Sequence, residues 1–551
     1  MSQTGSDEPV EPRRSRWRAA VHFIVAQQVQ TVLTVLAGLV ATPLLLGWLG
    51  AERFGLVRLL EATMALLGVG WVCLGTALGA GLVPRLARGD QRGVRQWVAA
   101  AQLLAAGISG AVLVLAALLV WLGPLGQPAS PALQGEWQAA FWLLLGGAAL
   151  LAPWQLARTV FEADQRGARV SGVLTFSSLL TTAVALLLAA QGGGLPGQAL
   201  AMLCGSALTA LWLYGWVRRT YAPWTWVIPP RQDFLTLFHH ASRLFLASLC
   251  GALAVRCEVL AIQVLHSPEE VTRYHLTQRL YALWQGQLLM LGTAVWAPLA
   301  DLYVRHERAV LQQRLGQAVA VLCALGCAGG VAALGYTEHF LHLWGVGREQ
   351  FLGGVAVAAF ALAMPTAALH SLFGWVLTAT GHSRQYVVSA GGFAFAAVAG
   401  CFGLGYLWGP SGVALGMTAA YAVSLLGNLA MLHYLGIFSL SRGLGPALRA
   451  LLLALPLAWL SWRSGQAHTP WGWLGLLAEM TAWFVAYLLL WVVTAPPQER
   501  QIGREFLNRF WPAREKSRAA PPAPSNSAAL ANAPPSAAED AQTRLPQNPP
   551  K

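Results

Sequence analysis

The chain has 551 residues, of which 56% are hydrophobic and only 11% are charged, and its formal net charge is +13. Soluble domains carry roughly 25% charged residues, so this composition excludes a soluble globular protein. The positive charges lie between apolar segments and form no continuous basic face, which argues against a nucleic-acid partner. The composition therefore predicts an all-α, polytopic membrane protein.

In chain order, the apolar stretches repeat at the length of about 20 residues that crosses a bilayer. Residues 1–20 form a basic, cytoplasmic arm, and the apolar run behind this arm is too long for a signal-peptide core. The next six spans form a predicted N-terminal lobe over 21–217. They lie at 21–47, 57–83, 97–122, 138–158, 170–190 and 196–217.

A longer, proline-containing connection at 218–242 is predicted to be a cytoplasmic linker between two lobes. The second lobe covers 243–436, and two extra spans follow within 447–494, which makes about 14 transmembrane helices. Residues 496–551 are rich in Pro, Ala, Ser and Asn and are predicted to be a disordered cytoplasmic tail. The later spans lie at 243–265, 275–304, 315–336, 351–376, 386–407, 411–436, 447–463 and 473–494.

The basic residues predict the orientation. With the N-terminus in the cytoplasm, 29 of the 36 Lys and Arg residues fall in cytoplasmic segments and 6 in outer segments. An excess of basic residues in short cytoplasmic loops is the usual determinant of orientation. Both termini are therefore predicted to be cytoplasmic, with the chain in the cytoplasmic (inner) membrane.

The first twelve spans are predicted to be two pseudo-symmetric copies of a six-helix unit. An offset of 220 residues aligns Phe54 with Tyr274 and Leu56 with Leu276. Both copies start on the same side of the membrane, so the repeat is parallel, as in transporters built from two lobes around a central path. The alternative is a weak likeness between two unrelated polytopic segments.

Ionisable side chains at membrane depth cost at least about 2.5–3.5 kcal/mol, so each is expected to face a cavity or a partner. Arg256 and Glu258 lie near the middle of the seventh span. Two residues apart on a helix, they point in different directions, so we expect them not to pair with each other. Cavity lining and a buried structural ion pair with another helix are the two alternatives.

Three further charged residues lie near the outer ends of their spans. Arg58 and Glu61 have i, i+3 spacing and are expected to pair on one helix face, although snorkelling also explains them. Arg279 lies at the matching end of the eighth span, where Gln278 and Gln285 continue a polar stripe. Because a planar guanidinium donates two parallel hydrogen bonds to a phosphate, arginines along a central path suit a pyrophosphate-bearing cargo.

Two residues near the cytoplasmic ends of spans complete the candidate set. Arg158 and His370 each lie one turn beyond a proline, Pro153 and Pro365, which permits bending during alternating access. Alternatively, Arg158 is a cytoplasmic anchor of the kind that the positive-inside rule describes. The alternative for His370 is a histidine that is only hydrogen-bonded within the membrane.

No sequence pattern indicates an enzyme. P-loop, HExxH and GxSxG motifs and a paired Cys/His ligand set are absent from the sequence. The seven cysteines lie in apolar segments without a CxxC pair and are expected to pack as small hydrophobic residues. Gly75-x-x-x-Gly79 and Gly412-x-x-x-Gly416 are expected to be helix-packing contacts. We therefore predict no catalytic residue, no metal and no cofactor.

The stretch TPLLLGWLGAERFGL, residues 42–56, resembles the junction of helices one and two in bacterial polysaccharide-exporting flippases. These belong to the multidrug/oligosaccharidyl-lipid/polysaccharide exporter superfamily. The basic loop PRLARGD at 84–90, the second junction ending at Tyr274 and the helix count extend the resemblance over about residues 20–495. Many relatives have an aspartate near the middle of helix seven, where this chain has Glu258 beside Arg256.

The resemblance implies a V-shaped pair of six-helix lobes with two extra C-terminal helices. It also implies a flippase that moves an undecaprenyl-diphosphate-linked oligosaccharide across the cytoplasmic membrane by alternating access, for cell-surface polysaccharide biosynthesis. Membrane lipids are the other expected partner, and a proton or a sodium ion is the candidate coupling cation. The predicted substrate-binding residues are Arg58, Glu61, Arg158, Arg256, Glu258, Arg279 and His370.

Two alternatives stay open. A multidrug or metabolite exporter of the same superfamily is expected to prefer acidic cavity residues for cationic drugs, and the arginines count against it. A non-transporting membrane scaffold would recruit a cytoplasmic partner through residues 496–551.

Overall fold

The computed structural model describes residues 13–121, 130–164, 166–220 and 227–496. This part of the chain is helical and contains no strand, so the predicted fold class is confirmed. The first half holds α1 (Arg13–Leu67), α2 (Val69–Ala87), α3 (Gln91–Trp121), η1 (Pro131–Leu133), α4 (Gln134–Gln155), α5 (Ala157–Ala163), α6 (Gly167–Ala190) and α7 (Gly194–Thr220). The second half holds α8 (Arg231–Leu265), α9 (Pro268–Val304), α10 (Arg308–Leu334), α11 (Thr337–Leu343), η2 (Arg348–Gln350), α12 (Gly354–Ala379), α13 (Ser383–Tyr434), α14 (Leu440–Ala467) and α15 (Gly472–Val493).

Twelve stretches of the described helices are long and apolar enough to cross a membrane, as in a multi-pass membrane protein. Two of them contain a break where the chain reverses, at Gly50 (φ 80°) in α1 and at Gly409 (φ 64°) in α13. Glycine adopts such positive φ angles without a steric penalty. The second part of α1 continues into α2, α13 holds two spans, and α9 is not among the twelve. When α13 is counted as two spans and α9 is added, the twelve stretches become the fourteen predicted membrane spans.

Several helices are longer than their apolar stretches. α8 begins at Arg231 and not at residue 243, so it includes much of the stretch predicted as a linker. The reason is packing, since Leu237 is fully buried and Asp233 forms an ion pair with Arg85 of α2 at 3.4 Å. The short helix α11 lies in a predicted loop. The predicted tail at 496–551 lies outside the described residues except for Pro496.

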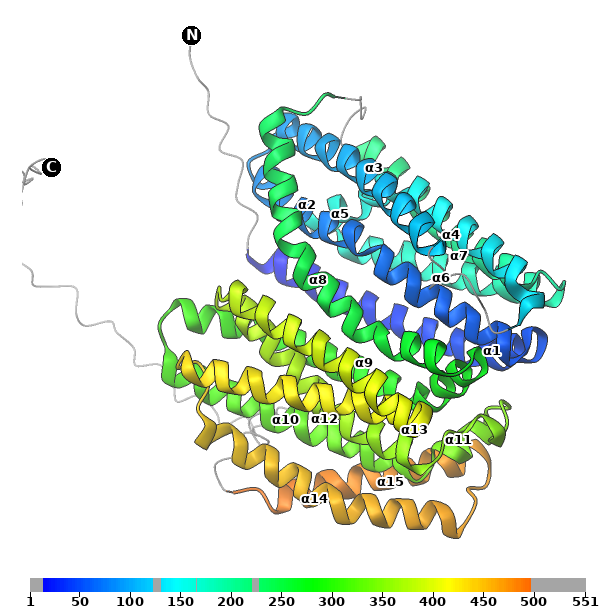
Figure 1. Ribbon diagram of the computed structural model, residues 1–551. Coiled ribbons are helices and arrows are strands. Elements are labelled where there is room, and N and C mark those ends of the chain that lie inside the picture. Colours follow the sequence, from blue (N-terminus) through cyan, green and yellow to red (C-terminus); the bar gives the residue numbers. More distant parts are fainter. Residues whose placement is uncertain (1–12, 122–129, 165, 221–226, 497–551) are drawn as a thin grey trace, which may run out of the picture. The chain divides into compact units, whose positions relative to one another are not determined.

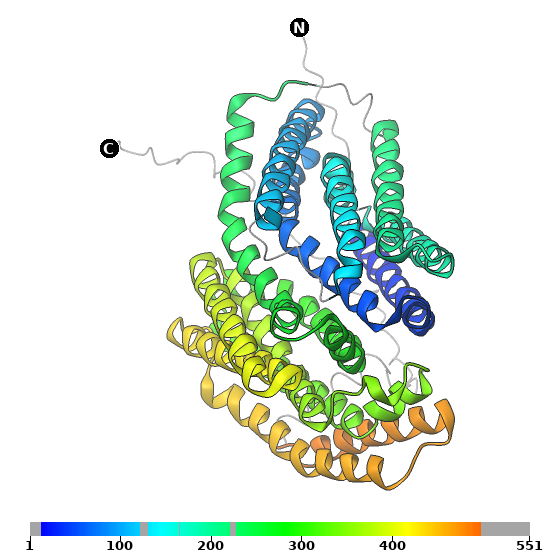
Figure 2. The same cartoon turned by 45° about the vertical axis from the view of Figure 1, so that its right-hand side comes forward.

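The helices of each predicted unit lie together. In Figure 2, α1 to α7, coloured blue to cyan, form one bundle, and α9 to α13 form another. α8 contacts both α2 and α13, and α1 contacts α9, so these helices join the two bundles. Figure 1 shows α8 running along both bundles. The aligned positions of the predicted repeat are all buried: Phe54, Tyr274, Leu56 and Leu276.

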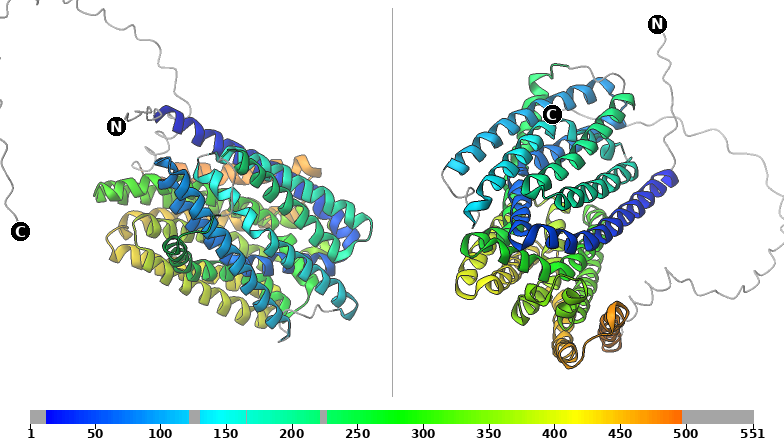
Figure 3. Two further views of the ribbon diagram at one scale, coloured as in Figure 1. Left: turned by 90° about the horizontal axis from the view of Figure 1, so that it is seen from above. Right: turned by 90° about the vertical axis from the view of Figure 1, so that its right-hand side faces the viewer.

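The largest core lies in the second bundle, around α10 and α12, the spans with the highest buried share. α14 and α15 pack on α10 at the edge of this bundle (Figure 3). The outer surface is apolar, with side chains such as Leu150, Phe395 and Leu474 exposed. In a membrane such positions face lipid, so an apolar exterior costs little there.

Both predicted glycine motifs are packing contacts. Gly75 and Gly79 of α2 face Thr159 of α5, and a Cβ on Gly416 would lie 2.3 Å from the backbone of Gly400, its neighbour across the two arms of α13. Small residues allow helices to approach this closely. The α13 hairpin therefore depends on glycine at position 416.

We expect Gly416→Val to lower stability, because the two arms of α13 must separate to admit the side chain. Overpacking of this kind costs about 1–3 kcal/mol. The measurement is the apparent midpoint of thermal unfolding of the purified protein. Gly427→Val is the matched control, since a Cβ at this exposed position of the same helix meets no atom within 4 Å. Equal midpoints for the two variants would contradict the packing role.

Candidate functional site

A chamber with a volume of about 510 Å³ lies inside the second lobe. Its walls are α8, α9, α12 and both arms of α13. A volume of about 300–1,000 Å³ is typical of small-molecule sites. Three of the predicted binding residues line this chamber: Arg256, Glu258 and His370.

Arg256 and Glu258 bring opposite charges to the α8 wall without pairing. Their side chains form no ion pair within the described residues, as their spacing predicted, and Glu258 instead accepts a hydrogen bond of 3.2 Å from Nε2 of Gln278. The Arg256 side chain is exposed on the chamber wall and has no hydrogen-bond partner among the described residues. The chamber thus presents a cationic side chain that interacts electrostatically with Glu258 but forms no ion pair among the described residues.

His370 belongs to a polar group between α12 and α13. Its Nδ1 atom shares a hydrogen bond of 2.9 Å with Oγ of Ser424 and lies 3.5 Å from Nδ2 of Asn428. Oγ of Ser389 donates to Oδ1 of the same asparagine. His370 is therefore held by hydrogen bonds, as one of the two alternatives for this residue predicted, and it lines the chamber as well.

Aromatic rings cover much of the remaining wall. The rings of Phe393 and Tyr421 lie 5.0 Å apart with an interplanar angle of 30°, and the Phe393 ring lies 4.3 Å from the His370 ring. The rings of Tyr281 on α9 and Phe360 on α12 lie 5.6 Å apart. Aromatic rings combined with a few polar groups are the usual composition of a small-molecule site.

A second charged group, which we call the interlobe group, consists of Arg58 and Glu61 on α1 and Arg279 on α9. Arg58 and Glu61 form the predicted i, i+3 pair at 2.8 Å, and the Arg58 guanidinium lies 4.8 Å from the centre of the Phe54 ring. Arg279 interacts electrostatically with both α1 residues, and its guanidinium approaches Gly38 of α1 closely. Arg279 forms no ion pair within the described residues, and its Nε atom is buried without a partner.

His275 connects the interlobe group to the chamber. It lines the chamber, its ring lies 6.3 Å from that of Phe54, and it experiences the charges of Arg58, Arg279 and Arg256. All three arginines therefore lie within electrostatic range of His275, near the place where α1, α8 and α9 meet.

Arg158 lies elsewhere. It is on α5, exposed, and paired with Glu162 at 2.7 Å, and it does not line the chamber. The structure thus brings six of the seven predicted residues into two adjacent groups and leaves Arg158 apart.

The sequence did not predict the aromatic lining. An aromatic residue in an apolar span is equally compatible with a position that faces lipid and with one that faces a chamber. One signal was available on α9. Gln278, Tyr281 and Gln285 are spaced i, i+3, i+7, and this places them on one helix face, which is the face that lines the chamber.

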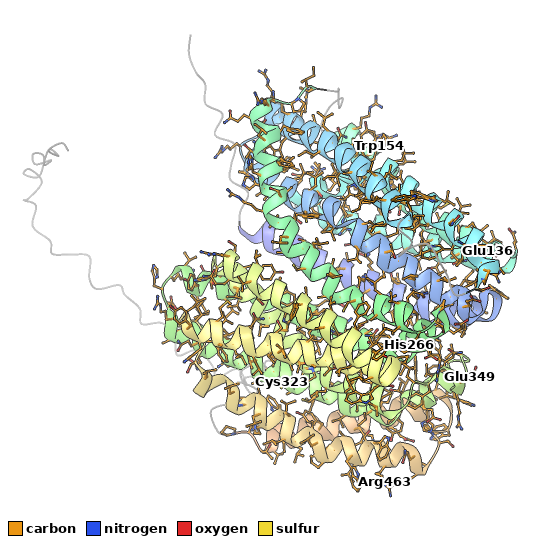
Figure 4. The ribbon with its side chains drawn as sticks, in the orientation of Figure 1. Glu136, Trp154, His266, Cys323, Glu349 and Arg463 are labelled. Atoms are coloured by element: carbon orange, nitrogen blue, oxygen red, sulfur yellow. The ribbon has the colours of Figure 1, made fainter. Side chains whose placement is uncertain are left out.

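Close contacts join the two lobes at the predicted outer end. Oγ1 of Thr272 donates a 2.7 Å hydrogen bond to the carbonyl of Ala51, and Gly55 packs directly on the carbonyl of Pro268. Nε1 of Trp344 donates to the carbonyl of Leu39 at 2.6 Å. Figure 4 labels His266 and Glu349 at this end of the second lobe. The lobes are therefore in contact at this end.

All seven cysteines are free, and the closest pair, Cys257 and Cys401, has an Sγ–Sγ distance of 3.5 Å. Among the residues that the structure describes, three or more His, Cys, Asp or Glu side chains nowhere gather in a metal-binding arrangement.

Comparison with solved structures places the fold. No family model and no curated protein matches the sequence. The lipid II flippase MurJ in an inward closed conformation is similar over 90% of this chain and 100% of its own, with a TM-score of 0.65 and 14% identity. An inward-facing multidrug resistance MATE family transporter of the MOP superfamily covers 75% of this chain and 98% of its own, with a TM-score of 0.61 and 15% identity. MATE in complex with MaL6 covers 76% and 96%, with a TM-score of 0.57 and 12% identity. The fold implied by the resemblance is thereby confirmed.

Proposed function

We propose, from a fold shared with a lipid II flippase and MATE transporters, that this chain is a flippase for a lipid-linked oligosaccharide. It would carry an undecaprenyl-diphosphate-linked glycan across the cytoplasmic membrane by alternating access of its two lobes, for cell-surface polysaccharide biosynthesis. Both termini would lie in the cytoplasm. Residues 496–551 would not be needed for the transfer.

The observation that carries this proposal is that Arg256 and Arg279 form no ion pair among the described residues, although Glu258 and Glu61 lie within electrostatic range of them. Arg256 and Arg279 form no ion pair with the described residues, although both lie in membrane-spanning helices, where an isolated charge costs at least about 2.5–3.5 kcal/mol. A diphosphate carries the compensating charge, and a guanidinium donates two parallel hydrogen bonds to it. Arg58, near Arg279, adds a third cationic group that Glu61 neutralises in part.

The charge balance of this region disfavours the drug-exporter alternative. Around His275 three arginines face only two acids, Glu61 and Glu258, so the region carries a net positive charge. A cationic drug would be repelled there, whereas an anionic lipid headgroup would be attracted. Glu258 is the acid in the chamber at which a proton or a sodium ion would couple to the transfer.

The test is made in cells that depend on the chain for a surface polysaccharide. We expect loss of the chain to stop polysaccharide assembly and to leave the lipid-linked precursor in the inner leaflet, where enzymes added to the outside cannot reach it. Truncation after Ala495 separates a flippase from a scaffold, because a flippase keeps its activity without the tail. Precursor that still reaches the outer leaflet without the chain would overturn the proposal.

A further inference from the structure

We propose that the chamber inside the second lobe binds the glycan of the cargo, and that the interlobe group together with Arg256 binds its diphosphate. This inference rests on the proposed function and divides the cargo between two adjacent sites. Sugar rings have apolar C–H faces and a rim of hydroxyl groups. A site for them needs aromatic surfaces for the faces and hydrogen-bonding groups for the rim.

The chamber supplies the aromatic surfaces. Phe393 and Tyr421 form one wall, and Tyr281 and Phe360 form part of another. An aromatic ring presents a broad apolar face whose π-electrons attract the weakly positive C–H groups of a sugar. Rings on separate helices, α9, α12 and α13, can contact a ligand from more than one side.

The chamber also supplies the hydrogen-bonding groups. Gln278 and Gln285 bring amides from α9, which both donate and accept hydrogen bonds, and Glu258 brings a carboxylate with acceptor capacity beyond its bond to Gln278. Oγ of Ser389 adds a hydroxyl from α13. Such mixed donors and acceptors suit hydroxyl groups, which need both.

The chamber and the diphosphate site are close enough for one lipid headgroup to occupy both. His275 lines the chamber and also experiences the charge of Arg58 and of Arg279. A diphosphate held by the interlobe group and Arg256 would thus direct the first sugar into the chamber toward Glu258. A cavity of about 510 Å³ restricts the bound part of the glycan to a few sugar units.

A variant that fills the chamber tests this inference without removing any wall side chain. Gly286 of α9 lines the chamber, and a Cβ at this position meets no atom within 4 Å. Gly286→Phe therefore places a ring in the empty volume of the chamber. The substitution is compatible with α9, because phenylalanine forms helices more readily than glycine does. Gly392→Phe is the matched control, because this exposed glycine of α13 also has open space but does not line the chamber.

The measurement is the dissociation constant of the full-length protein in nanodiscs for undecaprenyl diphosphate alone and for the same lipid carrying N-acetylglucosamine, glucose or galactose. We expect at least one sugar to tighten binding by about tenfold, and Gly286→Phe to remove this gain without changing the affinity for the sugar-free lipid. Gly392→Phe should keep the gain. Tyr421→Ala should reduce it and Tyr421→Phe should retain most of it, since only the alanine variant loses the ring.

The other outcomes show whether this inference fails alone or together with the proposed function. If the sugar-free and glycosylated lipids bind equally, or if Gly286→Phe weakens both by the same factor, the chamber does not hold the glycan and the inference fails, while the proposed function stands. If neither lipid binds but the cation tetraphenylphosphonium does, and Gly286→Phe abolishes its binding, the proposed function and this inference both fail.

Discussion

Replacing Arg256 and Arg279 together by glutamine should slow transfer of a diphosphate-linked sugar lipid by about a hundredfold or more. Each arginine has hydrogen-bond donors that no acidic side chain of the described residues uses, and each is expected to bond the diphosphate. A hydrogen bond to a charged group contributes about 1.5–3 kcal/mol, roughly tenfold or more per residue. The measurement is the rate at which labelled lipid changes leaflet in sealed vesicles that contain the purified variant.

Arg305→Gln is the matched control for this experiment. Arg305 directly follows α9, the helix that carries Arg279, but it is exposed and paired with Asp301 at 2.9 Å, as in a surface ion pair. Such exposed pairs contribute little to stability, so this variant should transfer lipid at the wild-type rate. Unchanged transfer by the double variant would show that the arginines do not hold the cargo.

Gly55→Leu should also reduce transfer by about tenfold or more, because it disturbs the contact between the two lobes and not the binding of the cargo. Gly55 packs on the carbonyl of Pro268, and a Cβ at this position would lie 1.8 Å from that oxygen. The leucine forces this part of α1 away from the start of α9, at a cost of about 1–3 kcal/mol to the conformation in which the lobes meet there. The proposed alternating-access cycle passes through that conformation, so the rate of leaflet exchange in sealed vesicles should fall.

Gly47→Leu is the control for this second variant. Gly47 precedes the break of α1 and is exposed, and a Cβ at this position would have no atom within 4 Å, so leucine fits there. Thr272→Val offers a milder change of the same contact, because it removes the 2.7 Å hydrogen bond to Ala51 and a 3.5 Å hydrogen bond to Pro268 within α9 but adds no bulk. Wild-type transfer by Gly55→Leu would mean that the outer contact is not part of the cycle.

The architecture was predictable from the sequence because lipid imposes a strong length requirement on each apolar segment. The connection between the spans 21–47 and 57–83, where α1 breaks at Gly50, followed from apolar length, and the pairing of Arg58 with Glu61 followed from an i, i+3 spacing. The extension of α8 back to Arg231 did not, since it depends on a tertiary contact between Asp233 and Arg85. The length of an apolar stretch alone therefore underestimates the length of a helix that continues beyond the lipid.

The site was predictable only in part, for a related reason. Ionisable residues at membrane depth are conspicuous, and six of them lie in the two adjacent groups. Their division between a chamber inside the second lobe and an interlobe group depends on how α8 and α9 are rotated, which no local pattern specifies. Phe393 and Tyr421 are chamber residues because of that same packing, while Phe395, two residues along α13 from Phe393, is exposed.

The proposed flippase activity is tested most directly with the wild-type chain in sealed vesicles that contain a labelled sugar on undecaprenyl diphosphate. We expect the protein to speed movement of this lipid between leaflets and not to accumulate the cation tetraphenylphosphonium. Vesicles in which the sugar lipid stays in its original leaflet while the cation accumulates would contradict the proposed function.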